Sequence, residues 1–182
     1  MILCGIDEAG RGPIAGDLVM AGCVLHSDIE GLNDSKKLSQ KRREFLYEKI
    51  IKNSTFHIVK FSPKEIDEDG ISKCLANGLK EIMTEIKADE YLFDGNTTFG
   101  VLGIKSMIKA DATISEVSAA SILAKVTHDR DIIKEAKKYP QYQFEKHKGY
   151  GTKLHIEMIK KYGYSNIHRK SYKIKALQAT LF

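Results

Sequence analysis

Short apolar runs separated by turn residues characterise much of the chain. Residues 2–6 and 18–25 form two such runs, and the glycines between them favour a reversal of the chain. We therefore predict two neighbouring strands near the N-terminus. Three further apolar segments have the length of strands, and they are 56–59, 91–93 and 104–108.

Apolar residues at helical spacing occur between and after these strands. The predicted helices cover residues 39–52, 71–86, 115–139 and 152–163. Ser39 and Thr152 are suitable N-caps, and Pro140 ends the longest helix. Pro63 suits the first turn of a further helix. This order of elements predicts a mixed α/β fold, and nothing in the sequence marks a linker between two domains.

The composition is that of an ordinary folded domain. The 182 residues are 42% hydrophobic and 29% charged, which suits one domain with a core of its own. Cys4, Cys23 and Cys74 lack the spacing of a disulfide or zinc motif, so we expect reduced core residues. No segment approaches the roughly 18 apolar residues of a membrane span. We expect a cytoplasmic monomer without membrane contact.

Charge is unevenly distributed around a net value of +5. Residues 146–175 contain nine basic residues and one acid, whereas 62–94 contain nine acids and four lysines. A concentrated basic segment favours a polyanionic partner such as nucleic acid. Two solvated helix faces would produce the same distribution, so the charge pattern leaves both interpretations open.

Two adjacent acids, Asp7 and Glu8, end the first predicted strand just before a glycine-rich loop. Carboxylates beside an apolar strand are costly unless a cation or hydrogen bonds compensate their charge. Because adjacent side chains of a strand point to opposite faces, both acids can serve one site only if the strand stops or bulges there. A divalent metal would provide the compensation.

Asp94 and Asp111 also follow short apolar strands. Taken singly, each is more often a turn residue or a helix cap than a functional group. If all four acids converge, they can hold two hard cations such as Mg²⁺ about 4 Å apart, an arrangement that serves phosphodiester hydrolysis. The sequence itself does not show that they converge.

The loop of Gly10, Arg11 and Gly12 suits contact with a nucleic-acid backbone. A dinucleotide-binding loop would be followed by a helix, whereas a predicted strand follows here. The backbone N–H groups of such a loop and the Arg11 guanidinium are typical contacts of phosphate groups. A plain tight turn is the alternative.

Tyr150 lies between two glycines in a second, basic loop. An exposed ring at this place can stack on a sugar or a base, while Lys148 and Lys153 contact phosphates. Lys36 and Lys37 are further candidates for phosphate contact, although a pair of lysines is more often solvated surface.

Five blocks of sequence together resemble the bacterial ribonuclease HII family, and the resemblance covers the whole chain. The blocks are GIDEAGRGP at 5–13, NDSKKLS at 33–39, FDGN at 93–96, AASILAKVT at 119–127 and HKGYGT at 147–152. The resemblance implies a ribonuclease H-like fold with a central mixed five-stranded sheet flanked by helices and a C-terminal helical extension. It predicts a catalytic core over 1–145, with the basic loop, helix and tail of 146–182 packed on the same domain.

The resemblance also implies an activity and its residues. Mg²⁺ or Mn²⁺ would be bound by the four catalytic acids, which are Asp7, Glu8, Asp94 and Asp111. The implied substrates are RNA–DNA hybrids and duplex DNA that contains ribonucleotides. Incision 5′ of a single ribonucleotide would leave 3′-hydroxyl and 5′-phosphate ends. The residues implied in recognition of the ribose 2′-OH are Gly10, Arg11, Gly12 and Tyr150.

The chain departs from the usual family sequence at supporting positions, with Asp17 in place of Pro, Ala110 in place of Gly and His128 in place of Arg. None of these departures replaces one of the four acids. We expect His128 to be a surface helix residue. We expect Asp129 and Arg130 to form an exposed pair near the site, worth little energetically.

The last residues place apolar side chains at a terminus, where burial is difficult. Gln178, Leu181 and Phe182 have the spacing of short peptides that dock on bacterial DNA sliding clamps, which predicts the clamp as a partner. The alternative is a tail that packs back on the domain.

Two other functions are weighed against this one. A different metal-dependent nuclease of the same fold would also gather acids, but the 10–12 loop together with Tyr150 argues against it. A catalytically silent nucleic-acid-binding module would suit the basic segment. The presence of all four acids argues against silence.

Overall fold

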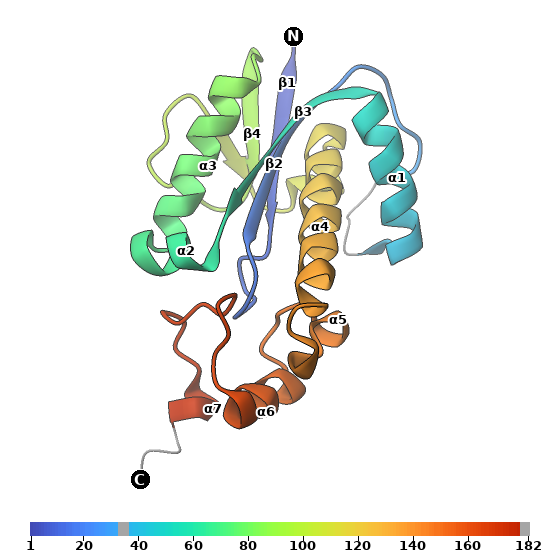
Figure 1. The fold of residues 1–182 in the computed structure, drawn as a ribbon. Helices are drawn as coiled ribbons and strands as arrows, with labels where there is room; N and C mark the ends of the chain where they lie inside the picture. Colours follow the sequence, from blue (N-terminus) through green and yellow to red (C-terminus); the bar gives the residue numbers. More distant parts are fainter. Residues whose placement is uncertain (33–36, 179–182) are drawn as a thin grey trace.

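The computed structural model describes residues 1–32 and 37–178, and a five-stranded mixed sheet forms their centre (Figure 1). The strands are β1 (Leu3–Ala9), β2 (Leu18–Leu25), β3 (Ser54–Phe61), β4 (Glu90–Asp94) and β5 (Lys105–Met107). They lie in the order β3-β2-β1-β4-β5. The strand β1 pairs antiparallel with β2 and parallel with β4. The predicted mixed five-stranded sheet is confirmed.

Helices connect and cover these strands. They are α1 (Gln40–Lys52), α2 (Pro63–Asp69), α3 (Ile71–Glu85), α4 (Ser115–Ala136), α5 (Phe144–His147), α6 (Lys153–Tyr162) and α7 (Lys175–Gln178), with the 3-10 turns η2 (Ala110–Ala112) and η3 (Pro140–Tyr142). Both predicted caps are confirmed, because the Ser39 and Thr152 side chains accept N–H bonds at the starts of α1 and α6. The helix α4 ends three residues before the predicted position 139, and α5 was not predicted.

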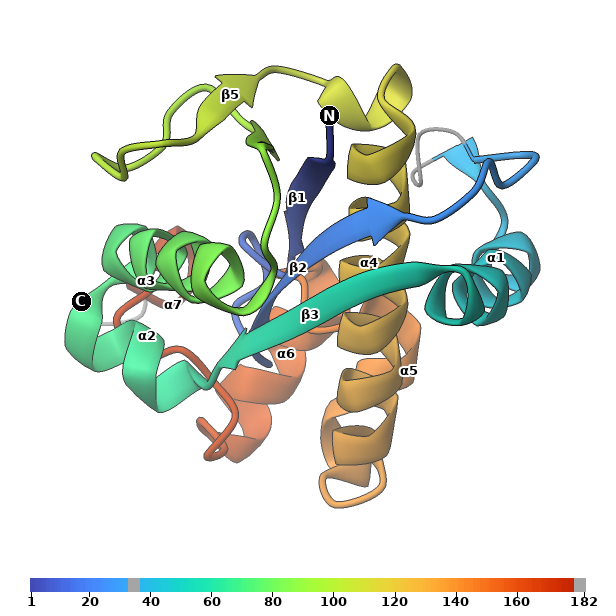
Figure 2. The ribbon, with the colours of Figure 1, turned by 90° about the horizontal axis from the view of Figure 1, so that it is seen from above.

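The helices form a layer on each face of the sheet. Figures 1 and 2 show α1 and α4 on one side and α2 and α3 on the other. Side chains of β2 alternate accordingly, with Leu18 and Met20 in the core beneath α2 and α3, and Val19 and Ala21 in the core beneath α1 and α4. All three cysteines are buried and free, as predicted.

A third apolar cluster joins the C-terminal part of the chain to the sheet. Ile14 and Ala15, from the loop before β2, pack with Ile132 of α4, Phe144 of α5 and Ile159 of α6. In Figure 1 these C-terminal helices lie below the end of the sheet at which β2 begins. The packing supports an extension built onto the same domain, and its boundary near residue 145 stays a prediction. Within the part of the chain that the structure describes, no helix is long and apolar enough to cross a membrane.

The N-terminal turn of α4 crosses β1 at very short range. A side-chain carbon at Gly5 would lie 2.3 Å from backbone atoms of Glu116 and Val117. The small residues Ala119 and Ala120 are fully buried in the same helix, in agreement with the close packing that an alanine-rich helix allows. Because Gly5 has no side chain, the backbone of α4 can approach β1 this closely and hold the strand against the helix.

Replacing Gly5 by alanine should therefore destabilise the protein, because backbone atoms cannot move aside as a flexible side chain would. We expect the free energy of unfolding to fall by about 1–3 kcal/mol, the usual cost of overpacking, measured by urea denaturation. Gly151→Ala is the matched control, since its added carbon would meet only Ile14 side-chain atoms at 3.7 Å. An unchanged urea midpoint for Gly5→Ala would show that the crossing is loose.

Candidate active site

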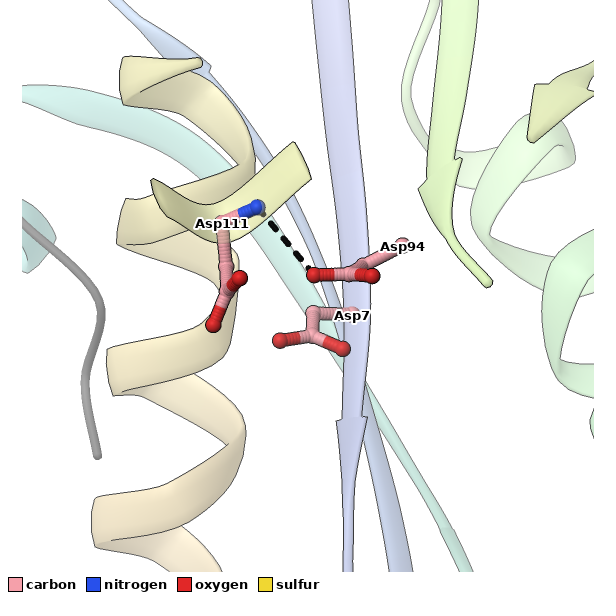
Figure 3. A group of neighbouring side chains, drawn as sticks. All are labelled: Asp7, Asp94 and Asp111. Carbon is pink, nitrogen blue, oxygen red and sulfur yellow. Dashed lines mark hydrogen bonds between the residues drawn. The ribbon is translucent and has the colours of Figure 1, made fainter. Parts of the chain in front are cut away.

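Three of the four predicted acids lie close together near the C-terminal ends of the neighbouring strands β1 and β4. Carboxylate oxygens of Asp7, Asp94 and Asp111 lie within 4.8 Å of one another. Ile6 pairs with Phe93 in the parallel β1–β4 ladder, so the next residues of the two strands, Asp7 and Asp94, lie side by side at the same end of the sheet. Figure 3 shows the three side chains converging from β1, β4 and η2. The convergence that the sequence could not show is thus present for these three.

Asp94 organises the turn that carries Asp111. Its carboxylate accepts the Lys109 N–H at 3.0 Å and the Asp111 N–H at 3.1 Å. Lys109 has a left-handed backbone with φ of 60°, which turns the chain sharply into η2. The carboxylate therefore fixes the backbone of the neighbouring ligand and keeps both of its own oxygens oriented.

Glu8 lies beside this group and outside it. The β1 strand neither stops nor bulges at Glu8, because its pairing with β2 continues without interruption to Ala9. The expected strand end or bulge is therefore absent. The Glu8 side chain nevertheless interacts with the cluster, because, beside burial, the Asp94 charge raises its pKa and a side-chain hydrogen bond with Asp7 lowers it. The Glu8 Oε1 atom lies 3.5 Å from the Arg11 guanidinium. Its Oε2 atom is buried and has no hydrogen-bond partner within residues 1–32 and 37–178.

Burial dominates the electrostatics of these acids. It raises the pKa of Asp7 well above its ordinary value, and the charges of Glu8 and Asp94 raise it further, against hydrogen bonds from Ser121 and the Glu8 N–H. Burial also raises the pKa of Glu8, which Arg11 opposes. Closely spaced buried carboxylates with an unused oxygen fit a hard divalent cation, because it would neutralise their charge and prefers oxygen ligands.

The two predicted recognition loops lie next to each other. A side-chain carbon at Gly12 would lie 3.8 Å from the Tyr150 ring. The Tyr150 side chain is 43% exposed, and the Lys125 ammonium of α4 lies 5.8 Å from its ring centre. The Arg11 guanidinium lies 5.5 Å from the ring centre of Phe99. Loops that are about 140 residues apart in sequence thus form one exposed surface.

The predicted phosphate-binding lysines differ in how far they are exposed. Lys153 is exposed at the start of α6, and Lys37 is exposed as well. Lys148 is partly buried, and its ammonium donates to the Glu145 carbonyl at 2.6 Å. Lys36 lies outside the described residues. So do Leu181, Phe182 and the Gln178 side chain, on which the clamp prediction rests.

One basic residue of the C-terminal segment has a different role from the one its charge suggests. Arg169 was counted among the cations available to a polyanion, yet its side chain is 0% exposed. Its guanidinium donates to the carbonyls of Gly10 at 2.6 Å and Gly16 at 2.8 Å. Sequence reasoning missed this residue, because its partners lie more than 150 positions away.

His128 is not a surface residue, and Asp129 and Arg130 do not form the expected exposed pair, although Arg130 itself is exposed. His128 is 2% exposed, because the loop at Gly10 covers this side of α4 and packs against its ring. Asp129 is buried and accepts hydrogen bonds from His128 and Lys125. Burial raises the pKa of Asp129, but the hydrogen bonds and the charges of His128 and Lys125 together outweigh burial and leave the pKa lowered. Arg130 forms its ion pairs with α1, at Glu44 and Glu48.

Comparisons with known proteins agree along nearly the whole chain. A family model described as Ribonuclease HII matches residues 4–175. The chain is 61% identical to Ribonuclease HII of Sulfurovum sp. (strain NBC37-1) over 181 residues. The matched region covers 99% of this chain and 96% of that relative. The ribonuclease HII in a PCNA:RNase HII complex from Archaeoglobus fulgidus has a TM-score of 0.83, 30% identity and 96% coverage of both chains. Ribonuclease H2 from Pyrococcus horikoshii OT3 has a TM-score of 0.78 and 31% identity, over 98% of this chain and 96% of that one.

The raised pKa of Asp7 predicts how stability depends on pH and metal. The folded state binds this proton more tightly than the unfolded chain, whose pKa is about 3.9, so ionisation weakens the fold as pH rises through the raised pKa. In metal-free buffer at pH 8, Asp7→Asn should therefore be more stable than wild type, by a margin that shrinks towards pH 4. Mg²⁺ or Mn²⁺ should stabilise wild type by about 2.7 kcal/mol at a hundred times the dissociation constant, and the variant less.

Thermal unfolding with and without a chelator measures both effects. Glu157→Gln is the control, because Glu157 is an exposed acid on α6 and its removal should change neither the pH dependence nor the response to metal. A metal-free Asp7→Asn protein that is less stable than wild type at pH 8 would contradict the electrostatic account.

Proposed function

The chain belongs to the ribonuclease HII family and is a ribonuclease H; on that premise we propose that it incises duplex DNA 5′ of a single ribonucleotide as well as the RNA strand of RNA–DNA hybrids. The products would carry 3′-hydroxyl and 5′-phosphate ends. The observation that carries the proposal is the position of the Asp7, Asp94 and Asp111 cluster at the same end of the sheet as the loops of Gly12 and Tyr150.

The proposed cofactor is Mg²⁺ or Mn²⁺, held by Asp7, Asp94 and Asp111 with Glu8 beside them. Every donor in this set is a carboxylate oxygen, which suits both ions. When bound, the ions would supply Lewis acidity at the scissile phosphate and favour ionisation of an attacking water. Asp94 would keep its orientation through the two N–H groups that it accepts.

Recognition of the ribose is assigned to Gly10, Arg11, Gly12 and Tyr150. A 2′-OH both donates and accepts a hydrogen bond, so backbone groups can read it where a glycine permits close approach. Gly12 leaves this space beside the Tyr150 ring. The exposed ring provides a flat face on which the adjacent sugar can stack. Deoxyribose lacks the hydroxyl and would leave those backbone groups unsatisfied.

Positioning of the duplex is assigned to the basic residues around these loops. Arg11 is 44% exposed and lies between Glu8 and the ring of Phe99. We assign phosphate contacts to Lys37, Lys148 and Lys153, and to Lys36, which lies outside the described residues. Such contacts fix register on the duplex and carry no base information, which suits an enzyme that recognises a sugar.

Cleavage of a duplex with one ribonucleotide tests the proposed function. Wild type should cut 5′ of the ribonucleotide with Mg²⁺ or Mn²⁺ and leave an all-DNA duplex of the same sequence intact. Asp94→Asn should lower kcat/KM by more than the roughly 10- to 100-fold typical of losing a supporting partner of a metal site. Tyr150→Ala should raise KM while Mn²⁺ binding, measured by calorimetry, stays unchanged. Cleavage of the all-DNA duplex, or full activity of Asp94→Asn, would refute the proposal.

The proposed protein partner is the bacterial sliding clamp, bound through Gln178, Leu181 and Phe182. Support comes from the terminal apolar spacing and from the Archaeoglobus fulgidus relative, which was solved in a complex with PCNA. Deletion of residues 178–182 should abolish retention of the protein on immobilised clamp, because the docking side chains are removed. The deleted protein should still cut a short oligonucleotide duplex at the wild-type rate, and equal retention of both proteins would exclude the tail as the docking site.

A further inference from the structure

Both loops assigned to ribose recognition are held by one C-terminal segment, residues 165–172, which we call the strap. Its backbone runs along the loop that precedes β2. The Gly16 N–H donates to the Ile167 carbonyl at 2.8 Å, and the Arg169 N–H donates to the Ile14 carbonyl at 2.9 Å. An isolated antiparallel bridge pairs Ala15 with His168. The strap is thus bound to residues 14–16 of the loop between β1 and β2 by main-chain hydrogen bonds, which do not depend on side-chain identity.

The Arg169 side chain hydrogen-bonds the main chain of the loop between β1 and β2. Its guanidinium reaches the carbonyls of Gly10, Arg11 and Gly16 at 2.6 to 3.3 Å. The Tyr172 hydroxyl accepts from Arg169 at 3.1 Å and donates to the Arg11 carbonyl at 2.9 Å. A buried cation with several fixed donors is therefore satisfied by main-chain oxygens of a single loop.

These bonds also orient the opposite side of the loop. In a trans peptide the C=O and the following N–H point in opposite directions. With the Gly10 and Arg11 carbonyls turned towards Arg169, the N–H groups of Arg11 and Gly12 face away from it. Arg169 thus determines the direction in which the loop presents its donors.

His168 connects the strap to the other loop through a chain of directed hydrogen bonds. The Ser165 N–H can only donate, so His168 Nδ1 accepts it at 2.9 Å and the neutral ring carries its hydrogen on Nε2. His168 Nε2 then donates to His155 Nε2 at 3.0 Å. His155 consequently carries its hydrogen on Nδ1, which donates to the Tyr150 carbonyl at 2.9 Å. Each tautomer follows from its neighbour.

The chain of histidines is buried and neutral. His155 is 0% exposed and His168 1%, and both pack against the Phe144 ring. Burial lowers the pKa of each to about 4. A second hydrogen between the two Nε2 atoms would bring two donors together and break the bond, so the neutral pair is the state that holds Tyr150.

We propose that His168 and Arg169 are positioning residues that set the 10–12 loop and the Tyr150 loop relative to each other. Arg169 bonds the 10–12 loop directly, and His168 reaches the Tyr150 loop through His155. Because His168 and Arg169 are adjacent in sequence, a shift of the strap would move both loops together. Discrimination between ribose and deoxyribose would then depend on a segment that does not itself touch the sugar. This inference rests on the proposed function, because it assumes that the two loops read the substrate.

A double-mutant cycle with Tyr150 tests whether His168 positions the Tyr150 loop. His168→Phe keeps an aromatic ring and removes the hydrogen bonds of the imidazole to Ser165 and His155, so KM for the single-ribonucleotide duplex should rise and kcat/KM should fall by about 10²-fold, as expected for a misplaced contact. His168→Gln can still donate from its amide and should lose less. In the Tyr150→Ala background, His168→Phe should cause no further loss, because a residue that acts through Tyr150 is not additive with it.

Two variants test whether Arg169 positions the 10–12 loop: one keeps the positive charge, and the other removes one hydroxyl that bonds the loop. Arg169→Lys retains the charge but replaces the planar guanidinium, whose separate nitrogens reach three carbonyls, by a compact ammonium, so it should raise KM as His168→Phe does. Tyr172→Phe deletes only the hydroxyl that bonds the Arg11 carbonyl and should show a smaller effect in the same direction with little risk to folding. His57→Gln and Arg130→Lys are matched controls, because both side chains form exposed pairs away from the loops.

Several outcomes would overturn the inference. Mn²⁺ affinity should equal that of wild type in every variant, and a parallel loss of Mn²⁺ affinity would indicate general damage to the fold. A His168→Phe effect of equal size in the wild-type and Tyr150→Ala backgrounds would show that it does not act through Tyr150. Normal cleavage by Tyr150→Ala or by Arg169→Lys would also overturn it. Failure of the proposed function is distinguishable, because wild type itself would then not cut at the ribonucleotide.

Discussion

Repulsion among buried and partly buried carboxylates is the constraint on which the rest of this site depends. Asp7, Asp94 and Asp111 bring oxygens within 4.8 Å of one another, and burial already raises the pKa of Asp7. Such a cluster persists because the elements that carry it are fixed by other contacts. Parallel pairing holds β1 against β4, α4 packs on β1 at the range that Gly5 permits, and Asp94 holds the η2 turn by two N–H groups. The fold supplies the geometry, and a cation would supply the compensating charge.

The acids and the groups assigned to ribose recognition lie on different kinds of structural element. The acids stand on strands and a short turn within the sheet, where pairing limits their movement. The groups to which we assign ribose recognition lie on two loops, which are hydrogen-bonded to the strap through the buried side chains of His168 and Arg169. Loops tolerate variation more readily than strands do, so recognition needs this additional support where hydrolysis does not.

The departures from the usual family sequence show how tertiary contacts change the meaning of a residue. His128 has a polar side chain on a helix, where a solvent-facing position is the ordinary expectation, yet the 10–16 loop covers it. Covering this side of α4 also buries Asp129 and leaves Arg130 to pair with α1. Arg169 is basic within a basic segment, yet its charge serves carbonyl oxygens inside the protein.

Local periodicity, helix caps and the resemblance of five blocks were enough to predict most of the elements, the class of fold and the residue types of the site, although α5 was not predicted. The starts of α1 and α6 follow directly from the N-caps Ser39 and Thr152. Only the tertiary structure decided which acids converge, that β1 continues past Glu8, and that residues 165–172 hold loops 10–12 and 150. The reason is physical: these outcomes depend on contacts between residues far apart in the chain, and neither periodicity nor charge carries information about them.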